Sequence, residues 1–487
     1  MKLTVCLLAS EAAPLSKTGG LADVSGALTK YLHSVGHDVR LFTPLYKSID
    51  RVKLGAQPLQ TLQNFEVPVG SHRYVFSALT AQLPGSTAPV YLLDCPVLFE
   101  RATLYTTDVD EHLRFMAFTR AVFIACQRLQ WAPRVLHCND WHTAFGPLFL
   151  KALYDTEPLF RGTRSLLTIH NIGYQGVFNA SEIDDVGLGL KNYLLHQDDL
   201  RAGKINPLRH GILYADAITT VSPTHAREIC TDQYGMGLQD SLRARGGAVS
   251  GILNGVDYEE WDPRRDRFIT KHFDPDNLQI KAELKRDFIA RMGLNIAPEV
   301  PLGGIVSRLA QQKGFELMFE SLPQVLSWRE FGLVVLGSGE PKYEEFFTQL
   351  QADFPGRVAF RRGYDDPLAH WIEAACDLFL MPSLYEPCGL NQMYSLRYGT
   401  VPIVRKTGGL ADSVEHYNPD TGSGTGIVFN DFNAEALEWG LNTALDLYAT
   451  PTHWLRMVRN GMRRDFSWQR QGGLYEQLYA KLLTQHA

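Results

Sequence analysis

Short apolar runs alternate along the chain with longer segments of mixed polarity. Most runs are continuous rather than alternating, and they end at Gly, Ser, Asp or His. Such runs predict strands that are buried on both faces of parallel sheets, with helices between them. The predicted strands are Leu3–Ala9, Val39–Thr43, Val90–Leu93, Val135–Cys138, Ser165–Ile169, Ala217–Val221, Leu302–Ser307, Phe331–Leu336, Val358–Phe360, Asp377–Met381, Val401–Val404 and Gly426–Phe429. The pattern predicts an α/β protein with doubly wound sheets.

The length of 487 residues exceeds what one hydrophobic core usually supports and predicts two domains. Residues 196–242 have the irregular polar pattern of short helices, and Gly246 and Gly247 then interrupt the chain. We therefore expect a first Rossmann-like domain over 1–248 and a second over 249–453. A helical segment over 454–487 is expected to pack back on the first domain.

Charge and cysteine usage exclude several classes of protein. The formal net charge is −6 and the pI is about 6.2, which argues against a nucleic-acid binder. The seven cysteines are scattered and lack CxxC spacing, so neither a disulfide framework nor a structural zinc site is predicted. A reducing cytoplasm fits best. We find no run that resembles a signal peptide or a membrane span, so no membrane partner is expected.

The heptapeptide KTGGLAD occurs at 17–23 and again at 406–412. In the first copy, Gly19 and Gly20 lie between a predicted strand and a run with helical spacing. Glycines allow a ligand to approach the backbone, and a helix start offers free N–H groups. Lys17 adds a positive charge, so this copy predicts a phosphate site; a tight turn with a solvated lysine is the alternative. The repetition favours two equivalent backbone cradles, one in each domain.

Two cations and a carboxylate follow predicted strands in the second half. Arg308 and Lys313 come after Leu302–Ser307, at the edge where open α/β sheets bind ligands. Two cations suit a pyrophosphate that gains charge as it leaves, although either alone would suit a plain surface position. Glu386 lies between Asp377–Met381 and an apparent helix, where a carboxylate can bind sugar hydroxyls and helix N–H groups can bind phosphate.

Histidines, asparagines and an aspartate follow two strands of the first half, in HCNDWH at 137–142 and HNIGYQG at 170–176. His137, Asp140 and His142 resemble a metal cluster, but their spacing is loose and no HExxH pattern supports it. Hydrogen bonding to a sugar needs the same residue types. We therefore predict a sugar site without a metal and without a cofactor.

Together these motifs resemble bacterial glycogen synthases and plant starch synthases, in order and over nearly the whole chain. The resemblance rests on KTGGLADV, HCNDWHT, TIHNIGYQG, YADAITTVSPTHAREI, ILNGVD, VSRLAQQKG, LGSGE, PSLYEPCGLNQMYSLRYGT and VRKTGGLADSV. It implies a GT-B type fold, in which two Rossmann-like domains face a cleft. It also implies transfer of glucose from ADP-glucose to the non-reducing end of glycogen or another α-1,4-glucan, with retention of configuration.

The resemblance implies a role for each matching residue. Those implied in transfer are His170 beside the anomeric carbon, Arg308 and Lys313 on the departing diphosphate, and Glu386 and Asp140 on the sugar or acceptor. Those implied in donor binding are Lys17, Gly19, Gly20, Asp23, Asn254, Tyr364 near the adenine, Cys388, Gly389, Leu390 and Asn391. Tyr105, His142 and Asn171 are implied at the sugar or acceptor.

Three positions depart from the common pattern or bear on the mechanism. Asn139 stands where many bacterial members have His, and Arg209 replaces a usual Lys while keeping the charge. Some related retaining transferases have a second Glu eight residues after the first, and here that position is Tyr394. Because no carboxylate pair is evident for a covalent intermediate, we expect a front-face displacement in which the leaving phosphate accepts the acceptor's proton.

Four alternatives remain at this point. A pyridoxal-phosphate-dependent phosphorylase would be a longer chain, and a dinucleotide oxidoreductase would need more than the partial Gly337-Ser338-Gly339 motif. A UDP-glucose-using glucan synthase would share the fold, because backbone contacts can read the base. A catalytically silent glucan-binding protein would bind glucan without releasing diphosphate.

Overall fold

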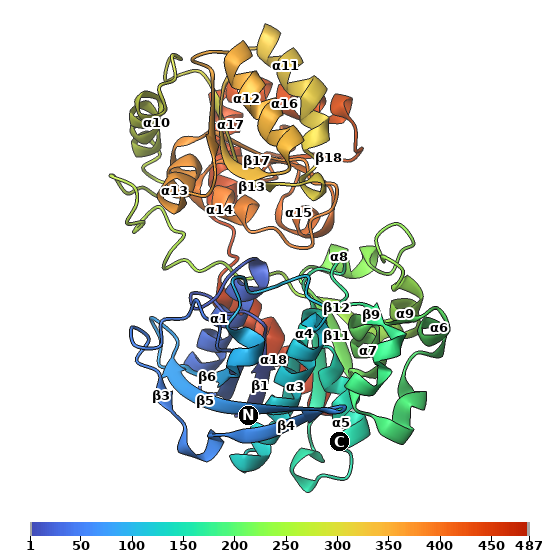
Figure 1. The fold of residues 1–487 in the computed structure, drawn as a ribbon. Helices are drawn as coiled ribbons and strands as arrows, with labels where there is room; N and C mark the ends of the chain where they lie inside the picture. The colour runs from blue at the N-terminus through green and yellow to red at the C-terminus, as the bar shows by residue number, and fades with distance from the viewer. Residues whose placement is uncertain (1, 485–487) are drawn as a thin grey trace. The chain divides into compact units, whose positions relative to one another are not determined.

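The computed structural model describes residues 2–484, which form two compact units (Figure 1). The first comprises the described residues of Met1–Val221, Ala226–Gly255 and Trp468–Ala487, and the second comprises Ser222–His225 and Val256–Ser467. The boundaries differ from those expected at 248 and 453. Strand β12 (Val249–Gly251) still pairs within the first sheet, and helix α17 (Pro451–Met462) packs on α14 (Asn391–Tyr398) and α16 (Ala434–Tyr448) of the second unit. Residues 485–487 of the predicted final segment lie outside the described residues.

The first unit is built on a 10-stranded sheet, within the part of the chain that the structure describes. Its order is β12-β11-β8-β7-β1-β2-β6-β5-β3, with β4 paired to β5; the strands from β12 to β6 are parallel. The remaining strands pair antiparallel. The bounds are β1 Thr4–Leu8, β2 Asp38–Pro44, β3 Gln57–Pro58, β4 Phe65–Val69, β5 His72–Gln82, β6 Pro89–Asp94, β7 Val135–Asn139, β8 Arg164–Ile169 and β11 Ala217–Thr220; β9 Phe178–Asn179 and β10 Lys204–Ile205 form a separate pair.

Helices pack around this sheet, and the final helix of the chain belongs to the same core. Tyr475 and Tyr479 of α18 are fully buried in the first unit's hydrophobic cluster, and α18 also packs against α1. The α-helices of the unit are α1 Gly20–Ser34, α2 Pro96–Phe99, α3 Glu111–Arg128, α4 Asp140–Thr143, α5 Phe145–Leu153, α6 Gln197–Arg201, α7 Pro207–Tyr214, α8 Pro223–Glu228 at its edge, α9 Gln239–Ala244 and α18 Trp468–Thr484.

The second unit is built on a six-stranded, fully parallel sheet in the order β15-β14-β13-β16-β17-β18. Its strands are β13 Leu302–Leu309, β14 Gly332–Gly339, β15 Val358–Arg362, β16 Leu378–Met381, β17 Val401–Arg405 and β18 Ile427–Phe429. Its remaining helices are α10 Gln279–Met292, α11 Met318–Trp328, α12 Pro341–Asp353, α13 Asp366–Ala375, α14 Asn391–Tyr398, α15 Gly408–Ser413 and α16 Ala434–Tyr448. None of the described helices combines the length and apolar character needed to cross a membrane.

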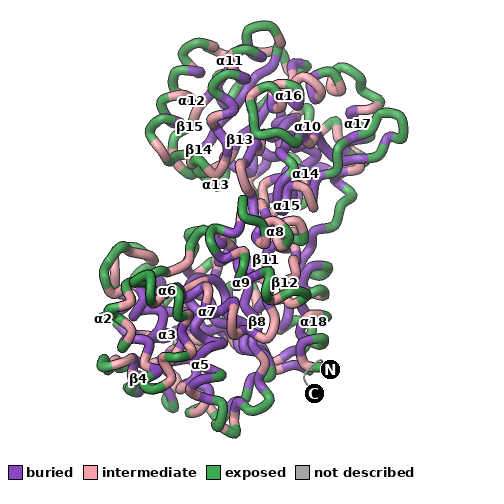
Figure 2. The backbone as a smooth tube through the Cα atoms, turned by 90° about the vertical axis from the view of Figure 1, so that its right-hand side faces the viewer, coloured by how far each residue is buried: buried purple, intermediate pink, exposed green. Residues whose placement is uncertain are grey.

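Burial explains why the apolar runs form these strands. Every residue of β7 and of β17 is buried, and Figure 2 shows buried segments in the interior of each unit and more exposed helices and loops around them. Burying a Val, Leu, Ile or Phe side chain contributes about 1.5–3 kcal/mol, so continuous apolar strands stabilise a sheet that is covered on both faces. Each predicted strand is confirmed. The hairpin of β4 and β5 was not predicted, because one face of β5 is partly exposed and its sequence alternates.

Strand order fixes where each unit can bind a ligand. Numbering the main strands of each sheet by their order along the chain, both follow 3-2-1-4-5-6: β6-β2-β1-β7-β8-β11 in the first unit and β15-β14-β13-β16-β17-β18 in the second. In such sheets the connections change direction between strands 1 and 4, and ligands bind beyond the carboxyl ends at that point. The relevant loops therefore follow β1 and β7 in the first unit, and β13 and β16 in the second.

Candidate active site

The first copy of KTGGLAD follows β1, directly at the switch point of the first sheet. Gly19 caps α1, and a Cβ built on Gly20 would meet nothing within 4 Å. Lys17 is half-exposed, with its Nζ 2.7 Å from Asp23 Oδ1. The space next to Gly20 is therefore open to a ligand, and the start of α1 and a lysine lie beside it.

Glu11, which no sequence motif predicted, holds this loop in place. Its buried Oε2 accepts hydrogen bonds from the backbone N–H of Thr18 at 2.5 Å and from the Thr18 hydroxyl at 2.9 Å. Burial raises the pKa of Glu11 to about 7, although the bonds from Thr18 act in the opposite direction. A single acidic residue after a strand matches no known sequence motif. Only its position at the end of β1 could have pointed to it.

Asp140 follows β7 and has a φ of +53°, a left-handed conformation that is uncommon for residues other than glycine. Its Oδ1 accepts from the backbone N–H groups of His170 at 2.7 Å and Asn171 at 3.3 Å. Burial raises the pKa of Asp140 to about 7. The carboxyl thus joins the loops after β7 and β8, and strain at this residue is of the kind found at functional sites.

His170 presents a buried hydrogen-bond acceptor at the same edge. Asn139 Nδ2 donates to the Leu8 carbonyl at 3.0 Å, which orients Asn139 so that its Oδ1 accepts from His170 Nε2 at 2.9 Å. The proton is therefore on Nε2, and the buried Nδ1 lone pair has no partner among the described residues. Burial lowers the pKa of His170 to about 3, so the ring is neutral at pH 7. A sugar hydroxyl is a suitable donor to Nδ1.

Tyr105 and His142 form an aromatic pair beside this edge. Their rings stack with centroids 4.7 Å apart, and the Tyr105 hydroxyl lies 2.8 Å from Ser10 Oγ. His142 is buried and Tyr105 is partly buried, and burial lowers the pKa of His142 well below its usual value. Asn171 accepts from the Gly173 N–H at 3.0 Å and so also shapes its own turn.

His137 lies elsewhere, within the sheet. Its Nδ1 is 2.9 Å from the Tyr479 hydroxyl of α18, and its Nε2 is 2.6 Å from Thr168 Oγ1. Both ring nitrogens therefore have partners in the core, and burial lowers the pKa of His137 to about 3. The metal-like trio noted in the sequence separates into one core residue, His137, and two residues of the candidate site, Asp140 and His142.

At the switch point of the second unit, a lysine and a glutamate form an ion pair. Lys313, after β13, places its Nζ 2.6 Å from Oε2 of Glu386, which follows β16. The Ser383 hydroxyl donates to the same oxygen at 3.1 Å. Glu386 is only 5% exposed, whereas Arg308 is exposed and makes no ion pair with any described residue. The structure thus places a positive charge and an ordered carboxylate together where the fold binds ligands.

The second copy of KTGGLAD has a different environment from the first. It follows β17, and a Cβ on Gly408 would lie 1.9 Å from the Glu386 carbonyl oxygen, while one on Gly409 would lie 2.0 Å from that of Cys388. The Gly409 N–H donates to the Glu386 carbonyl at 3.0 Å. These glycines are covered by the protein's own backbone. The prediction of two equivalent open cradles is wrong, because the second copy supports the Glu386 loop.

The loop from Cys388 to Asn391 leads into α14. Cys388 is buried, Gly389 has a φ of +72°, and Leu390 precedes the first helical residue. Asn391 Nδ2 donates to the Val306 carbonyl at 2.6 Å, which ties the loop to β13. Gln392, which was not among the predicted site residues, donates to the carbonyls of Cys388 and Gly389 at 3.0 and 2.9 Å. Neighbouring hydrogen bonds therefore fix the conformation of this loop.

Tyr364, Asn254 and Arg209 lie outside the groups of site residues described above. Tyr364 is 79% exposed, and its hydroxyl donates to Asp366 Oδ1 at 2.9 Å. Asn254 is buried, shortly after β12. Arg209 donates to Ser241 Oγ at 2.9 Å and to the Gly237 carbonyl at 3.0 Å, so its charge is anchored within the first unit.

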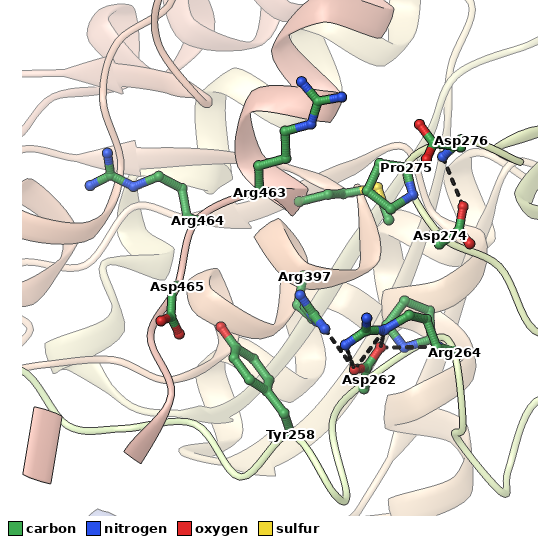
Figure 3. Close-up of a pocket in the computed structure, with 12 residues that line it drawn as sticks. Tyr258, Asp262, Arg264, Asp274, Pro275, Asp276, Arg397, Arg463, Arg464 and Asp465 are labelled. Carbon is green, nitrogen blue, oxygen red and sulfur yellow. Dashed lines mark hydrogen bonds and ion pairs between the residues drawn. The ribbon is translucent and has the colours of Figure 1, made fainter. Parts of the chain in front are cut away.

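A separate pocket of about 470 Å³ in the second unit contains none of the predicted site residues (Figure 3). Arg264 and Arg397 converge on the fully buried Asp262, with nitrogen–oxygen distances of 2.7 and 2.6 Å. The pocket is lined by equal numbers of arginines and aspartates, and the pairs at its base satisfy one another. Its composition does not favour a particular ligand.

Comparisons with known proteins agree with this arrangement. A family model described as starch synthase catalytic domain matches residues 4–244, and one described as glycosyl transferases group 1 matches residues 290–461. The chain is 44% identical over 483 residues to a glycogen synthase of Koribacter versatilis, covering 98% of each chain. It is 42% identical over 485 residues to one of Anaeromyxobacter dehalogenans, covering 99% of this chain and all of the other.

Solved structures show the same fold. The catalytic domain of starch synthase IV from Arabidopsis thaliana, bound to ADP and acarbose, has a TM-score of 0.90 at 33% identity and covers 99% of this chain and 100% of its own. A sucrose-phosphate synthase from Thermosynechococcus elongatus has a TM-score of 0.62 at 16% identity with the same coverage, which shows likeness of fold alone. The predicted fold class of two Rossmann-like units of GT-B type is confirmed.

Proposed function

The chain belongs to the glycogen and starch synthase family of glucosyltransferases, and from that premise we propose which substrates and residues its reaction uses. The donor is ADP-glucose, and the acceptor is the non-reducing end of glycogen or another α-1,4-glucan. The observation that carries the proposal is the Lys313–Glu386 pair at the switch point of the second sheet, with Arg308 exposed on the neighbouring part of β13.

Arg308 and Lys313 stabilise the leaving diphosphate. Positive groups aimed at developing charge contribute most where a leaving group gains charge in the transition state. Glu386 holds the Lys313 ammonium at 2.6 Å and so keeps it in place before the substrate binds. Cys388, Gly389, Leu390 and Asn391 bind the donor through the backbone and the start of α14, and Tyr364 offers an exposed ring to the adenine.

The first unit contributes groups that bind the donor phosphates and the sugar. Lys17, with Asp23 beside it, and the open backbone at Gly19 and Gly20 suit the donor phosphates. The unpartnered Nδ1 of His170 accepts a sugar hydroxyl, and Asp140, which fixes the His170 backbone, orders the sugar or acceptor.

Further groups are assigned to the sugar or acceptor. Tyr105 and His142 offer a stacked aromatic pair and Asn171 supplies an amide, while the amide of Asn254 serves the donor.

The reaction proceeds by front-face displacement. The bond from the anomeric carbon to the diphosphate oxygen breaks, and a bond to the acceptor's 4-oxygen forms on the same face. The departing phosphate takes the acceptor's proton, so configuration is retained without a covalent intermediate. Glu386 suits binding rather than attack, because its Oε2 already accepts from Lys313 and Ser383. Tyr394, at the position of a possible second carboxylate, stacks on Trp261 with ring centroids 4.0 Å apart.

The test is release of nucleoside diphosphate from ADP-glucose and from UDP-glucose, each with and without glycogen. Glycogen-dependent ADP release, with much slower UDP release, supports the proposal. Faster release of UDP would leave the family assignment intact and would overturn the assignment of ADP-glucose as the donor. Glycogen binding without release of either diphosphate would point to a silent glucan-binding protein. We also propose a cytoplasmic location, since all seven cysteines are free thiols.

A further inference from the structure

His370, on α13 of the second unit, has one ring nitrogen in a fully buried hydrogen bond, and the other has no hydrogen-bond partner within residues 2–484. Its Nδ1 lies 2.8 Å from Asp266 Oδ2, and both side chains are fully buried. Asp266 also accepts from the Tyr398 hydroxyl at 2.6 Å and from the Phe268 N–H at 2.8 Å. Because Asp266 is surrounded by donors, His370 Nδ1 carries the proton, and Nε2 presents a lone pair.

The Nε2 atom is buried and has no hydrogen-bond partner among the described residues. A buried acceptor without a partner is uncommon in native structures and calls for a specific explanation. One ring nitrogen of His370 and one carboxylate oxygen each of Asp366 and Glu260 all lie within 4.8 Å of one another. Because Nδ1 is engaged by Asp266, Nε2 is the nitrogen that remains available to an ion. Asp366 is four residues before His370 on α13, so helical geometry brings the two side chains to the same face.

Aromatic stacking holds the third residue in position. Trp261 is sandwiched between His370, with ring centroids 3.7 Å apart, and Tyr394, at 4.0 Å. Glu260 directly precedes Trp261, so this packing fixes the backbone that carries the Glu260 carboxylate next to α13. The His370 ring is likewise fixed by Trp261 on its face and by Asp266 at its edge.

We propose that His370, Asp366 and Glu260 bind a divalent transition-metal ion of the zinc class in the second unit. A histidine that donates one ring N–H to a carboxylate and offers the other nitrogen to a metal is the usual arrangement of metal-binding histidines. One imidazole with two carboxylates suits Zn²⁺, whereas Mg²⁺ and Ca²⁺ prefer ligand sets made of oxygen alone. Solvent molecules complete the coordination, because Glu260 is exposed.

The ion has a position distinct from the leaving-group cations. It joins the segment around Glu260, shortly after the chain enters the second unit, to the start of α13. Asp366 also accepts from the Tyr364 hydroxyl at 2.9 Å. A bound ion therefore orders the segment beside the proposed adenine contact and takes no part in the transfer step.

The test is calorimetric titration of the EDTA-treated, dialysed full-length protein with Zn²⁺. The wild type is expected to bind one equivalent through this site, and Glu260→Gln and Asp366→Asn are each expected to weaken that binding at least tenfold. Glu259→Gln is the matched control, because Glu259 is the exposed neighbouring acid and pairs with Arg265 instead. Both test variants change side chains that are not fully buried, and circular dichroism in EDTA checks that each is folded.

A second readout is the thermal midpoint with and without Zn²⁺. Binding to the folded state alone raises the midpoint, so wild type and Glu259→Gln should gain a shift that the two test variants lose. Zn²⁺ affinity that is equal in all variants, or absent from the wild type, would overturn the site. Tighter binding of Mg²⁺ than of Zn²⁺ would overturn the assignment of the ion class.

Discussion

The two copies of KTGGLAD share seven residues and have opposite surroundings. In the first unit the heptapeptide follows β1, and a Cβ on Gly20 would meet open space. In the second it follows β17, and its glycines contact the backbone of the Glu386 loop. The equivalent aspartates differ as well, because Asp23 pairs with Lys17 while Asp412 accepts from the Thr224 N–H and hydroxyl at 2.7 Å each.

The difference follows from the position of each copy in its sheet. Strand β1 borders the switch point, where the loops on either side diverge and leave room for a ligand. Strand β17 is the fifth strand of its sheet, next to β16, so the loop after β16 lies over the loop after β17. The same sequence therefore exposes its backbone in one unit and supports another loop in the other. In the second copy the glycine pair is required because the protein's own main chain approaches closely, whereas in the first copy the glycines leave the backbone accessible.

Lys313→Ala should have the largest effect. The second heptapeptide supports the Glu386 loop and does not itself bind the substrate. Catalysis should therefore depend on Lys313, which pairs with Glu386, and not on Lys406 of the heptapeptide. Loss of one preorganised group that stabilises transition-state charge costs about 10²–10³ in kcat. Steady-state ADP release measures this, with Lys406→Ala as the matched control, expected within about twofold of wild type since an exposed lysine is removed. Equal losses in the two variants would refute the division of roles.

Gly409→Ala should destabilise the protein strongly, since its Cβ would lie 2.0 Å from the Cys388 carbonyl oxygen and the backbone would have to move. Overpacking of this kind costs about 3 kcal/mol. Gly20→Ala, at the corresponding position of the first copy, meets no atom within 4 Å and should leave stability unchanged or slightly higher. Denaturant unfolding compares the two. Similar losses in both would mean that the first copy is also packed.

Glu11→Gln should remove part of the pH dependence of the free energy of unfolding. This part arises at the first heptapeptide, where Glu11 accepts from Thr18. The pKa of Glu11 rises from 4.5 to about 7 on folding, so its contribution to stability is fully present below pH 4.5 and is lost as pH rises to about 7. Because one pKa unit corresponds to about 1.4 kcal/mol, the loss is about 3 kcal/mol. Asp140 acts in the same direction, so the informative quantity is the difference between wild type and variant from pH 4.5 to 7. Identical pH profiles would contradict the buried position of Glu11.

Lys17→Ala should have the smallest of the four effects. Its ammonium is half-exposed and already paired with Asp23, so it attracts the donor's phosphates through a partly screened charge. We expect KM for ADP-glucose to rise about tenfold with little change in kcat, which corresponds to about 1.4 kcal/mol. Initial rates against donor concentration at fixed glycogen measure it. A fall in kcat with an unchanged KM would place Lys17 in the transfer step instead.

The sequence predicted the parallel strands well because burial on both faces leaves a continuous apolar run. It did not predict β4 and β5, whose alternation reflects a sheet that is exposed on one side. Among the site residues, the motif-bearing groups after β1, β7, β13 and β16 were predicted and lie at the switch points. Glu11, Ser383 and Gln392 were missed, because each acts through a neighbour that only the folded chain supplies. The prediction that the two heptapeptides form equivalent cradles failed for the same reason. Their surroundings depend on strand order, which seven residues do not determine.

The return of α18 to the first unit has a consequence for synthesis on the ribosome. Translation completes residues 256–467 before Trp468, Tyr475 and Tyr479 exist, although these three belong to the first unit's core and Tyr479 holds His137. The unit encoded first therefore lacks part of its interior until residues 468–484 are made, while the unit encoded second has its whole sequence earlier. A released chain that ends at residue 467 should contain a folded second unit and an unfinished first one, the reverse of the usual order in which domains mature.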